Sequence, residues 1–402
     1  MPDYLSPGVY IEEFEIGAKP IEGVSTSTAG FVGFAERGPL NIPTLVISFA
    51  QYQSIFGGYL PKRSGDVRWL SYAVEAFFNN GGQRVYVTRV AELNKSKSDP
   101  ASYATGVDAV VMGKDDAEPS KRTGIHTLKN INEISLVAIP GITTQAVQNS
   151  LITQCEEMKN RFAVLDPGFG KDLKGIQDQR NLYDSKYAAL YYPWLQVYDP
   201  LSQGPVNAPP SGIICGIYAR VDNERGVHKA PANEKINGAL GLEKLPDGSS
   251  RIINKGEQDI LNPKGINCIR SFPGRGIRVW GARTISGDNL WKYVNVRRLF
   301  IYVEESIREN TRWVVFEPNN EKLWGRLKAT ITEFLTRVWN DGALMGKKPE
   351  EAFFVKCDRT TMTQDDIDNG RLVCIIGIAP VKPAEFVIFR IAQWQGGSAV
   401  TE

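Results

Sequence analysis

Few residues in this chain have the types and spacing that catalysis or metal binding requires. There are only two histidines, His126 and His228, so a histidine-based metal site would need both of them together with carboxylates. His228 lies between Arg225 and Lys229, whose positive charges oppose a divalent cation. Neither an HExxH helix nor a GxSxG nucleophile turn occurs. The sequence therefore predicts no catalytic residue, no metal site and no cofactor.

The nearest approach to a phosphate-binding loop is Gly168-Phe-Gly-Lys171, which follows an apolar run over 162–165. Its spacing differs from GxxxxGK(S/T), and Asp166-Pro167 interrupts the strand-to-helix turn that would aim backbone N–H groups at phosphate. We interpret it as an ordinary turn. The alternative that it leaves open is an α/β nucleotide-binding enzyme, for which thermal stabilisation by a nucleotide is the test.

The remaining acidic and sulfur-containing groups favour structural roles. Asp365, Asp366 and Asp368 lack the spacing of a calcium loop and fit the start of a short helix, where carboxylates interact favourably with the positive helix end. The five cysteines are far apart and include no CxxC pair, which favours free, buried thiols in a reducing compartment. They are Cys155, Cys215, Cys268, Cys357 and Cys374.

Size and charge exclude several classes of function. At 402 residues the chain is long enough for two or three packed regions. Its 47 basic residues nearly cancel its 45 acidic residues, and a net charge of +2 gives no reason to expect direct binding of nucleic acid. We find neither a signal peptide nor an apolar run of about 18 residues, the length of a membrane span. We expect cytoplasmic synthesis and no membrane insertion.

The hydrophobic pattern predicts a mixed α/β (α+β) fold with a layered α/β core. A strand over 133–139, a helix over 144–160 and a strand over 162–165 form a βαβ unit, which implies a parallel pair of strands. A later helix, after 318–320, carries an apolar stripe at helical spacing: Trp324, Leu327, Ile331, Phe334, Leu335 and Val338. Further strands are predicted over 29–35, 44–48, 84–90, 187–198, 266–271, 276–285, 353–357 and 371–379, and further helices over 71–80, over 211–219 and from near Asn295.

These elements divide the chain into three parts. Residues 1–28 form an N-terminal strand arm and linker. Residues 29–340 form the α/β core, within which 91–132, rich in Lys, Ser, Asp and Gly, is expected to be a surface excursion. Residues 341–402 form a C-terminal β-rich domain that ends in an arm.

Both ends of the chain carry an apolar strand without a local partner, and such a strand either completes a sheet of its own domain or pairs with another chain. Flexible or angle-setting residues lie beside each strand, and we expect hinges at Gly17 and Gly23 and at Lys382 and Pro383. The residues predicted to exchange between subunits are Val9, Tyr10 and Ile11 at one end and Phe386, Val387, Ile388, Phe389, Ile391 and Trp394 at the other.

Several strings in the chain together resemble one family, the contractile tail sheath proteins of myophage tails, R-type pyocins and phage-like contractile injection systems. Many phage sheaths have Trp where this chain has His228, and residues 91–132 match no part of the family pattern. The strings are Pro7-Gly-Val-Tyr-Ile-Glu-Glu13, Thr28-Ala-Gly-Phe-Val-Gly33, Ala35-Glu-Arg-Gly-Pro39, Asn80-Gly-Gly82, Arg225-Gly-Val-His-Lys-Ala-Pro-Ala-Asn233, Pro273-Gly-Arg-Gly-Ile-Arg-Val-Trp-Gly-Ala-Arg-Thr-Ile-Ser286 and Leu299-Phe-Ile-Tyr-Val-Glu-Glu-Ser-Ile307.

The resemblance implies a structural subunit that polymerises as helically stacked hexameric rings around an inner tube, exchanges its terminal strands with neighbours, and contracts to drive the tube through a target envelope. By this resemblance, residues 29–340 are expected to form the sheath core, and residues 341–402 are expected to form the inner domain. The implied partners are further copies of the chain, an inner tube protein, and baseplate and terminal cap proteins, within a phage tail or phage-like particle. The residues expected to face the tube are Lys322, Arg326, Lys328 and Arg337.

Overall fold

The computed structural model describes residues 20–62, 67–92, 106–388 and 390. Among these residues, no helix combines the length and the apolar composition that a membrane crossing requires. Several residues of the predicted arms lie outside the described ranges: Val9, Tyr10, Ile11, Gly17, Phe389, Ile391 and Trp394.

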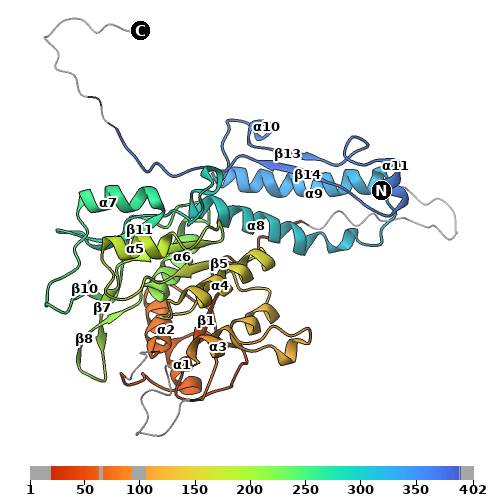
Figure 1. The fold of residues 1–402 in the computed structure, drawn as a ribbon. Helices are drawn as coiled ribbons and strands as arrows, with labels where there is room; N and C mark the ends of the chain where they lie inside the picture. The colour runs from red at the N-terminus through yellow and green to blue at the C-terminus, as the bar shows by residue number, and fades with distance from the viewer. Residues whose placement is uncertain (1–19, 63–66, 93–105, 389, 391–402) are drawn as a thin grey trace, which may run out of the picture.

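A nine-stranded mixed sheet forms the centre of the larger part of the molecule (Figure 1). Its order is β2-β3-β1-β4-β5-β6-β11-β12-β9, in which neighbours from β3 to β11 run parallel and the outer pairs run antiparallel. The strands are β1 (Ala29–Gly33), β2 (Thr44–Val46), β3 (Val85–Arg89), β4 (Leu136–Ala138), β5 (Phe162–Leu165), β6 (Ala188–Tyr192), β9 (Glu234–Lys235), β11 (Ile266–Phe272) and β12 (Gly276–Val279).

Helices and a small antiparallel sheet surround this central sheet. The predicted βαβ unit is confirmed, because β4 and β5 pair in parallel and α4 connects them. The helices are α1 (Phe49–Phe56), α2 (Trp69–Asn79), α3 (Val107–Met112), α4 (Gln145–Met158), α5 (Leu173–Arg180), α6 (Ser211–Arg225) and α7 (Lys255–Leu261), with a 3-10 helix, η3 (Gly124–Asn130). The small sheet has the order β10 (Ala239–Leu242), β7 (Leu195–Asp199), β8 (Gly204–Ala208).

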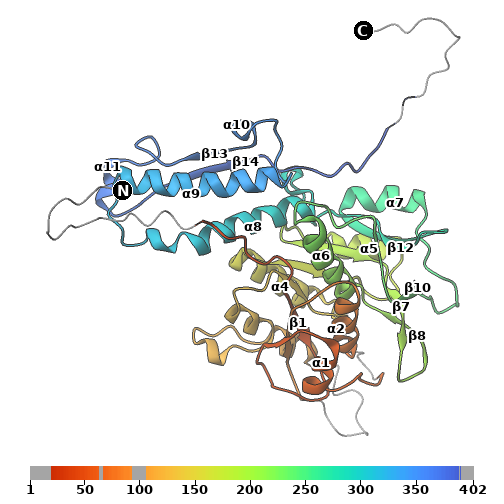
Figure 2. The ribbon, with the colours of Figure 1, turned by 180° about the vertical axis from the view of Figure 1, so that it is seen from behind.

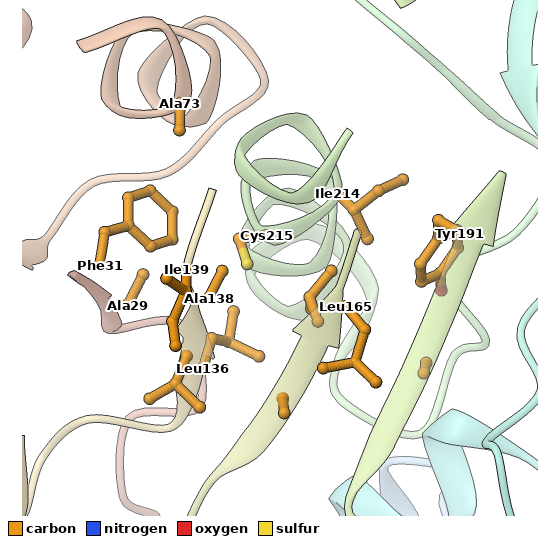
Figure 3. Packing of buried hydrophobic residues seen from close by; sticks show 14 of the residues in the cluster. Ala29, Phe31, Ala73, Leu136, Ala138, Ile139, Leu165, Tyr191, Ile214 and Cys215 are labelled. Carbon is orange, nitrogen blue, oxygen red and sulfur yellow. The ribbon is translucent and has the colours of Figure 1, made fainter. Parts of the chain in front are cut away.

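The main core lies between the central sheet and its helices. The parallel strands are almost wholly buried, which explains why they are nearly continuous apolar runs without alternation. Figure 3 shows α6 above the sheet, with Ile214 and Cys215 close to the side chains of Ala138 and Leu165. The burial of this large apolar surface is the main source of stability for the body.

Part of the segment 91–132, expected to be a surface excursion, contributes to the main core in the residues that the structure describes. Val111, Ile125 and Leu128 are fully buried in the main core. The side chain of Arg161 also donates to the carbonyl oxygens of Leu128 (2.9 Å) and Ile131 (3.0 Å), which holds η3 against the sheet. Apolar residues are sparse in this segment and follow no regular period, so the sequence pattern concealed its contribution to the core.

A second core lies between α8 (Val294–Asn310), α9 (Glu321–Asn340) and a hairpin of β13 (Phe353–Lys356) and β14 (Ile375–Ile378). These elements project from the α/β body, and the hairpin lies along α9 (Figure 1). The short helices α10 (Pro349–Ala352) and α11 (Gln364–Asp368) flank the hairpin. All six residues of the predicted stripe on α9 are buried here. The expected boundary at 340 does not divide the cores, because α9 and much of α8 pack with the hairpin.

Candidate functional site

The chain runs along α8 before it enters the central sheet (Figure 2), and we call residues 20–28 the N-terminal strap. Ile21 is buried in the second core, and its carbonyl oxygen accepts a hydrogen bond from Arg337 (2.6 Å). Asn310 donates to the carbonyl oxygen of Glu22 (2.9 Å), and the Val24 N–H donates to the Ser306 hydroxyl (3.1 Å). The strap is therefore attached to both long helices.

A buried ion pair fixes the other end of the strap. Arg298 of α8 donates through both terminal nitrogens to the carboxylate of Asp222 on α6, and the two side chains are only 4% and 3% exposed. Arg298 also donates to the carbonyl oxygen of Thr26 (2.8 Å), whose hydroxyl donates to Asp222 (2.7 Å). The guanidinium lies over the ring of Tyr218 (4.9 Å). This cluster ties together the strap, the α/β body and the second core.

Gly23, which the sequence suggested as a hinge, lies where the strap packs closely against α8. A Cβ atom added there would lie 2.2 Å from the hydroxyl oxygen of Tyr302, so a side chain at this position would require the Tyr302 ring to move. The hydrogen bonds of Glu22 and Val24 fix the backbone on both sides. The glycine allows close contact with α8, and its position within the strap gives no sign of hinge motion.

The C-terminal segment is anchored at two points before it leaves the molecule. The Val381 N–H donates to the carbonyl oxygen of Ala343 (3.1 Å), and Asn295 donates to the carbonyl oxygen of Val381 (3.3 Å). Glu385 provides the second anchor. The predicted hinge, Lys382-Pro383, lies between these two anchors, so the first residue after both is Phe386.

We call the second anchor the Glu385 clamp. Its carboxylate accepts bonds from Arg283 Nε (2.8 Å) and Nη2 (2.7 Å), from Asn262 Nδ2 (2.8 Å) and from the Tyr293 hydroxyl (3.0 Å). Lys292 Nζ lies 3.8 Å away. Burial raises the pKa of Glu385, but the bonds from Arg283, Asn262 and Tyr293 outweigh it and hold the pKa below 4.5.

Removal of the Glu385 carboxylate should release this segment. We expect Glu385→Ala to increase amide hydrogen exchange over 382–388 about tenfold or more, because charge-assisted bonds contribute about 1.5–3 kcal/mol in proteins. Exchange would be followed by mass spectrometry at neutral pH. Lys382→Ala, which changes an exposed side chain between the two anchors, is the matched control and should leave exchange unchanged. Equal exchange in all three proteins would contradict the assignment of the clamp.

The clamp should also weaken in acid. Because the folded-state pKa of Glu385 is lower than its value of 4.5 in a model compound, the carboxylate stabilises the attached state above pH 4.5. That contribution is lost as the pH falls through the folded-state pKa. We expect faster exchange over 382–388 below pH 4.5 in the natural chain, corrected for the intrinsic pH dependence of exchange, and no such change in Glu385→Ala.

Beyond the clamp, three apolar side chains extend into solvent. Phe386 and Val387 are each 69% exposed and Ile388 is 80% exposed. The structure assigns none of these three residues to a strand, and the segment runs away from the body (Figure 1). The apolar C-terminal residues that the structure describes therefore do not complete a sheet of their own domain.

The hairpin presents strand edges that no other described strand covers. Within the described residues, β13 and β14 form a sheet of two strands only. Phe354 on β13 and Ile375 on β14 are exposed on its outer face. A two-stranded sheet leaves a row of unpaired N–H and C=O groups on each side, which can bind an additional strand.

The four basic residues predicted to face a tube do not form one stripe. Arg337 donates to the strap, and the guanidinium of Arg326 lies over the ring of Trp313 (4.8 Å) near the end of α8. Lys328 lies toward the hairpin, where its charge partly opposes the rise that burial causes in the pKa values of Cys357 and Cys374. Lys322 is exposed in the first turn of α9.

Both glycine N–H groups of the loop that suggested a nucleotide site are already bonded within the protein. The Gly168 N–H donates to the Gln179 side chain (2.8 Å), and the Gly170 N–H donates to the carboxylate of Glu243 (2.7 Å). A negatively charged carboxylate thus occupies the place that a phosphate would need. The alternative of a nucleotide-binding enzyme is wrong for this loop. Anchored chain ends, an exposed apolar arm and open strand edges instead define a structural subunit that assembles with other chains.

Comparison with known proteins agrees with this class. Residues 125–285 match the phage tail sheath protein central domain, and residues 286–393 match the phage tail sheath C-terminal domain. The chain belongs to the phage tail sheath protein family. It is a sheath subunit of a contractile tail or injection system, and a structural protein of a phage tail or phage-like particle rather than an enzyme.

Relatives and solved structures support the family over almost the whole chain. A prophage major tail sheath protein of Pseudomonas aeruginosa is 24% identical over 403 residues, covering 96% of this chain and 97% of the relative. The helical sheath of the anti-feeding prophage in its contracted state is 32% identical, with a TM-score of 0.76 over 96% of this chain and 99% of that chain. The contracted PVC sheath, from an extracellular contractile injection system, is 30% identical, with a TM-score of 0.75 over 98% and 99%.

Proposed function

We propose that this subunit polymerises as helically stacked hexameric rings around an inner tube by exchange of terminal strands. The exposed segment Phe386–Ile388, which follows an anchored Glu385, is the observation that carries the proposal. In a neighbouring subunit, the open edges of β13 and β14 provide matching backbone groups. A strand given to a neighbour is a heterologous contact, and such contacts repeat without closing and build a helical assembly.

Contraction in this proposal moves whole subunits and leaves their internal structure unchanged. A baseplate signal would release an extended, metastable lattice, and the subunits would rotate as rigid bodies into a shorter and wider one. The strap and the Glu385 clamp support this mechanism because they fix where each arm leaves the body. Motion between neighbours would then be confined to the chain beyond the anchors, before residue 20 and after Glu385.

Electron microscopy of the purified protein, alone and with its inner tube protein, tests the proposal. Hollow cylinders with helical hexameric layers are the expected result, and their pitch would identify the extended or contracted state. Dispersed monomers under both conditions would contradict it. In this proposal, assembly takes place in the cytoplasm, and baseplate and terminal cap proteins bind the two ends of the sheath.

The exposed basic residues Arg326 and Lys328, on different sides of α9, are our candidates for contact with an acidic tube surface. We expect Arg326→Glu combined with Lys328→Glu to reduce sedimentation of the subunit with tubes several-fold, because reversed charges repel such a surface. Exposed ion pairs contribute only about 0–1 kcal/mol each and are screened by salt, so the difference should shrink in concentrated salt. Lys347→Glu combined with Lys348→Glu, an equal reversal of two charges at exposed residues outside α9, is the control. Unchanged sedimentation of the α9 double variant would exclude these two residues.

A further inference from the structure

Two of the five cysteines face each other at the end of the β13–β14 hairpin. The antiparallel register pairs Phe353 with Ile378 and Lys356 with Ile375, so the next facing pair is Cys357 and Cys374. Directly opposed residues in an antiparallel pair have Cα atoms about 4.5–5.5 Å apart. A disulfide requires a Cα separation of about 4.4–6.8 Å. Continuation of this register by one residue gives the two cysteines the backbone spacing that a cross-strand disulfide needs.

The surroundings hold the two thiols together. Cys357 is buried in the second core, whereas Cys374 is only partly buried, and the two thiols lie close enough for each to affect the pKa of the other. The hydroxyl of Thr361 donates to the carbonyl oxygen of Val373 (2.8 Å), which fastens the chain just before Cys374 to the turn after Cys357. The pair can therefore react without rearrangement of the backbone.

We propose that Cys357 and Cys374 form a dithiol–disulfide site that a disulfide oxidant such as oxidised glutathione converts to a cross-strand bond. The partly exposed Cys374 loses its proton and attacks one sulfur of oxidised glutathione, which releases one glutathione thiolate and forms a mixed disulfide. Cys357 then loses its proton and attacks Cys374 Sγ, which releases the second glutathione. Two protein thiols are oxidised, and one molecule of oxidised glutathione is reduced to two thiols.

Burial of the two cysteines should slow formation of the disulfide and also slow its reduction once it has formed. Burial raises the pKa of Cys374 to about 12 and also raises that of Cys357, while Lys328 of α9 opposes both shifts. Little thiolate therefore exists at neutral pH, and the bond should form over hours rather than seconds. Once it has formed, a reductant must reach a sulfur packed between the hairpin and α9. The bond is independent of the proposed exchange of strands, because both cysteines belong to one chain.

The test uses the full-length protein with oxidised or reduced glutathione, followed by alkylation under denaturing conditions and peptide mass spectrometry. We expect the number of free thiols to fall from five to three and the cross-linked peptides to contain Cys357 and Cys374. The three buried cysteines of the main core, Cys155, Cys215 and Cys268, serve as internal controls that stay reduced. Oxidation should raise the thermal midpoint by several degrees, because the bond constrains the unfolded chain.

The Cys374→Ser variant distinguishes oxidation of the Cys357–Cys374 pair from oxidation of the other cysteines. It should fold as the natural chain does, keep four free thiols after treatment, and show no rise in the thermal midpoint. The proposal is overturned if all five thiols remain reduced in the natural chain, if glutathione stays attached to Cys374 without a cross-link, or if Cys374→Ser gains the same stability. Treatment of the natural chain in denaturant, where all cysteines are accessible, confirms that the oxidant is active.

Discussion

Deletion of residues 386–402 is expected to abolish sheath assembly and leave a folded monomer. The deletion begins directly after the Glu385 clamp, so both cores and both anchors of the C-terminal segment remain. The described residues that it removes are exposed and pair with no strand of their own chain, so the fold should lose little stability. The deletion removes the contact that this arm makes with a neighbouring subunit. Because every subunit carries the deletion, this contact is missing throughout the polymer.

Electron microscopy and analytical ultracentrifugation would measure this loss, and circular dichroism would check the fold. A full-length chain in which Phe386, Val387 and Ile388 are all changed to Ser keeps the backbone but removes the apolar side chains. It should assemble into fewer and shorter sheaths than the natural chain. Sheaths of normal length and number from the deleted chain would disprove the role of the arm.

Removal of the buried charge of Arg298 should cause the largest loss of stability of any single substitution considered for this protein. Arg298→Met leaves the Asp222 carboxylate buried without its main partner, and loss of one member of a buried ion pair costs about 3–5 kcal/mol. The free energy of unfolding would be measured in urea on the chain that ends at Glu385, so that polymerisation does not interfere. The strap should also become accessible to protease, because Arg298 binds the carbonyl oxygen of Thr26.

A matched control is available near the other end of the same helix. Arg312 pairs with Glu309 just after α8, but its side chain is 67% exposed, so Arg312→Met should change the free energy of unfolding by no more than about 1 kcal/mol. Combining Arg298→Met with Asp222→Asn removes both buried charges and should restore part of the lost stability. Equal effects of Arg298→Met and Arg312→Met would show that burial of the pair is unimportant.

Sequence reasoning succeeded where a regular pattern repeats. The βαβ unit around α4 and the buried stripe of α9 were predicted because strands and helices place apolar residues at fixed intervals. The core residues of η3 were missed because short 3-10 turns carry no such pattern. Mixed α/β architecture was therefore predictable from the sequence, but the packing of 107–131 was not.

The anchors of the two chain ends were harder to predict because they depend on distant partners. Glu385 and Arg283 are 102 residues apart in sequence, and Arg298 and Thr26 are 272 residues apart. One local signal was available, since Glu385 is the only acidic residue in the apolar run 384–394. An acidic residue in such a run indicates a specific partner. The close approach of Gly23 to Tyr302 was not predicted, because a glycine that permits close packing and one that permits bending look alike in sequence.

The two chain ends are fastened at opposite ends of one helix, and this determines how a pulling force would cross the subunit. The strap reaches Asn310 at the last turn of α8, and the clamp includes Tyr293 just before its first turn. The 17 residues of α8 span about 25 Å. Tension that enters at one chain end can therefore leave at the other along a single stiff rod. Because Arg283 of the clamp is also bonded to Asn267 of β11, the central sheet would share part of this load, and the α/β body could keep its shape while the lattice around it changes.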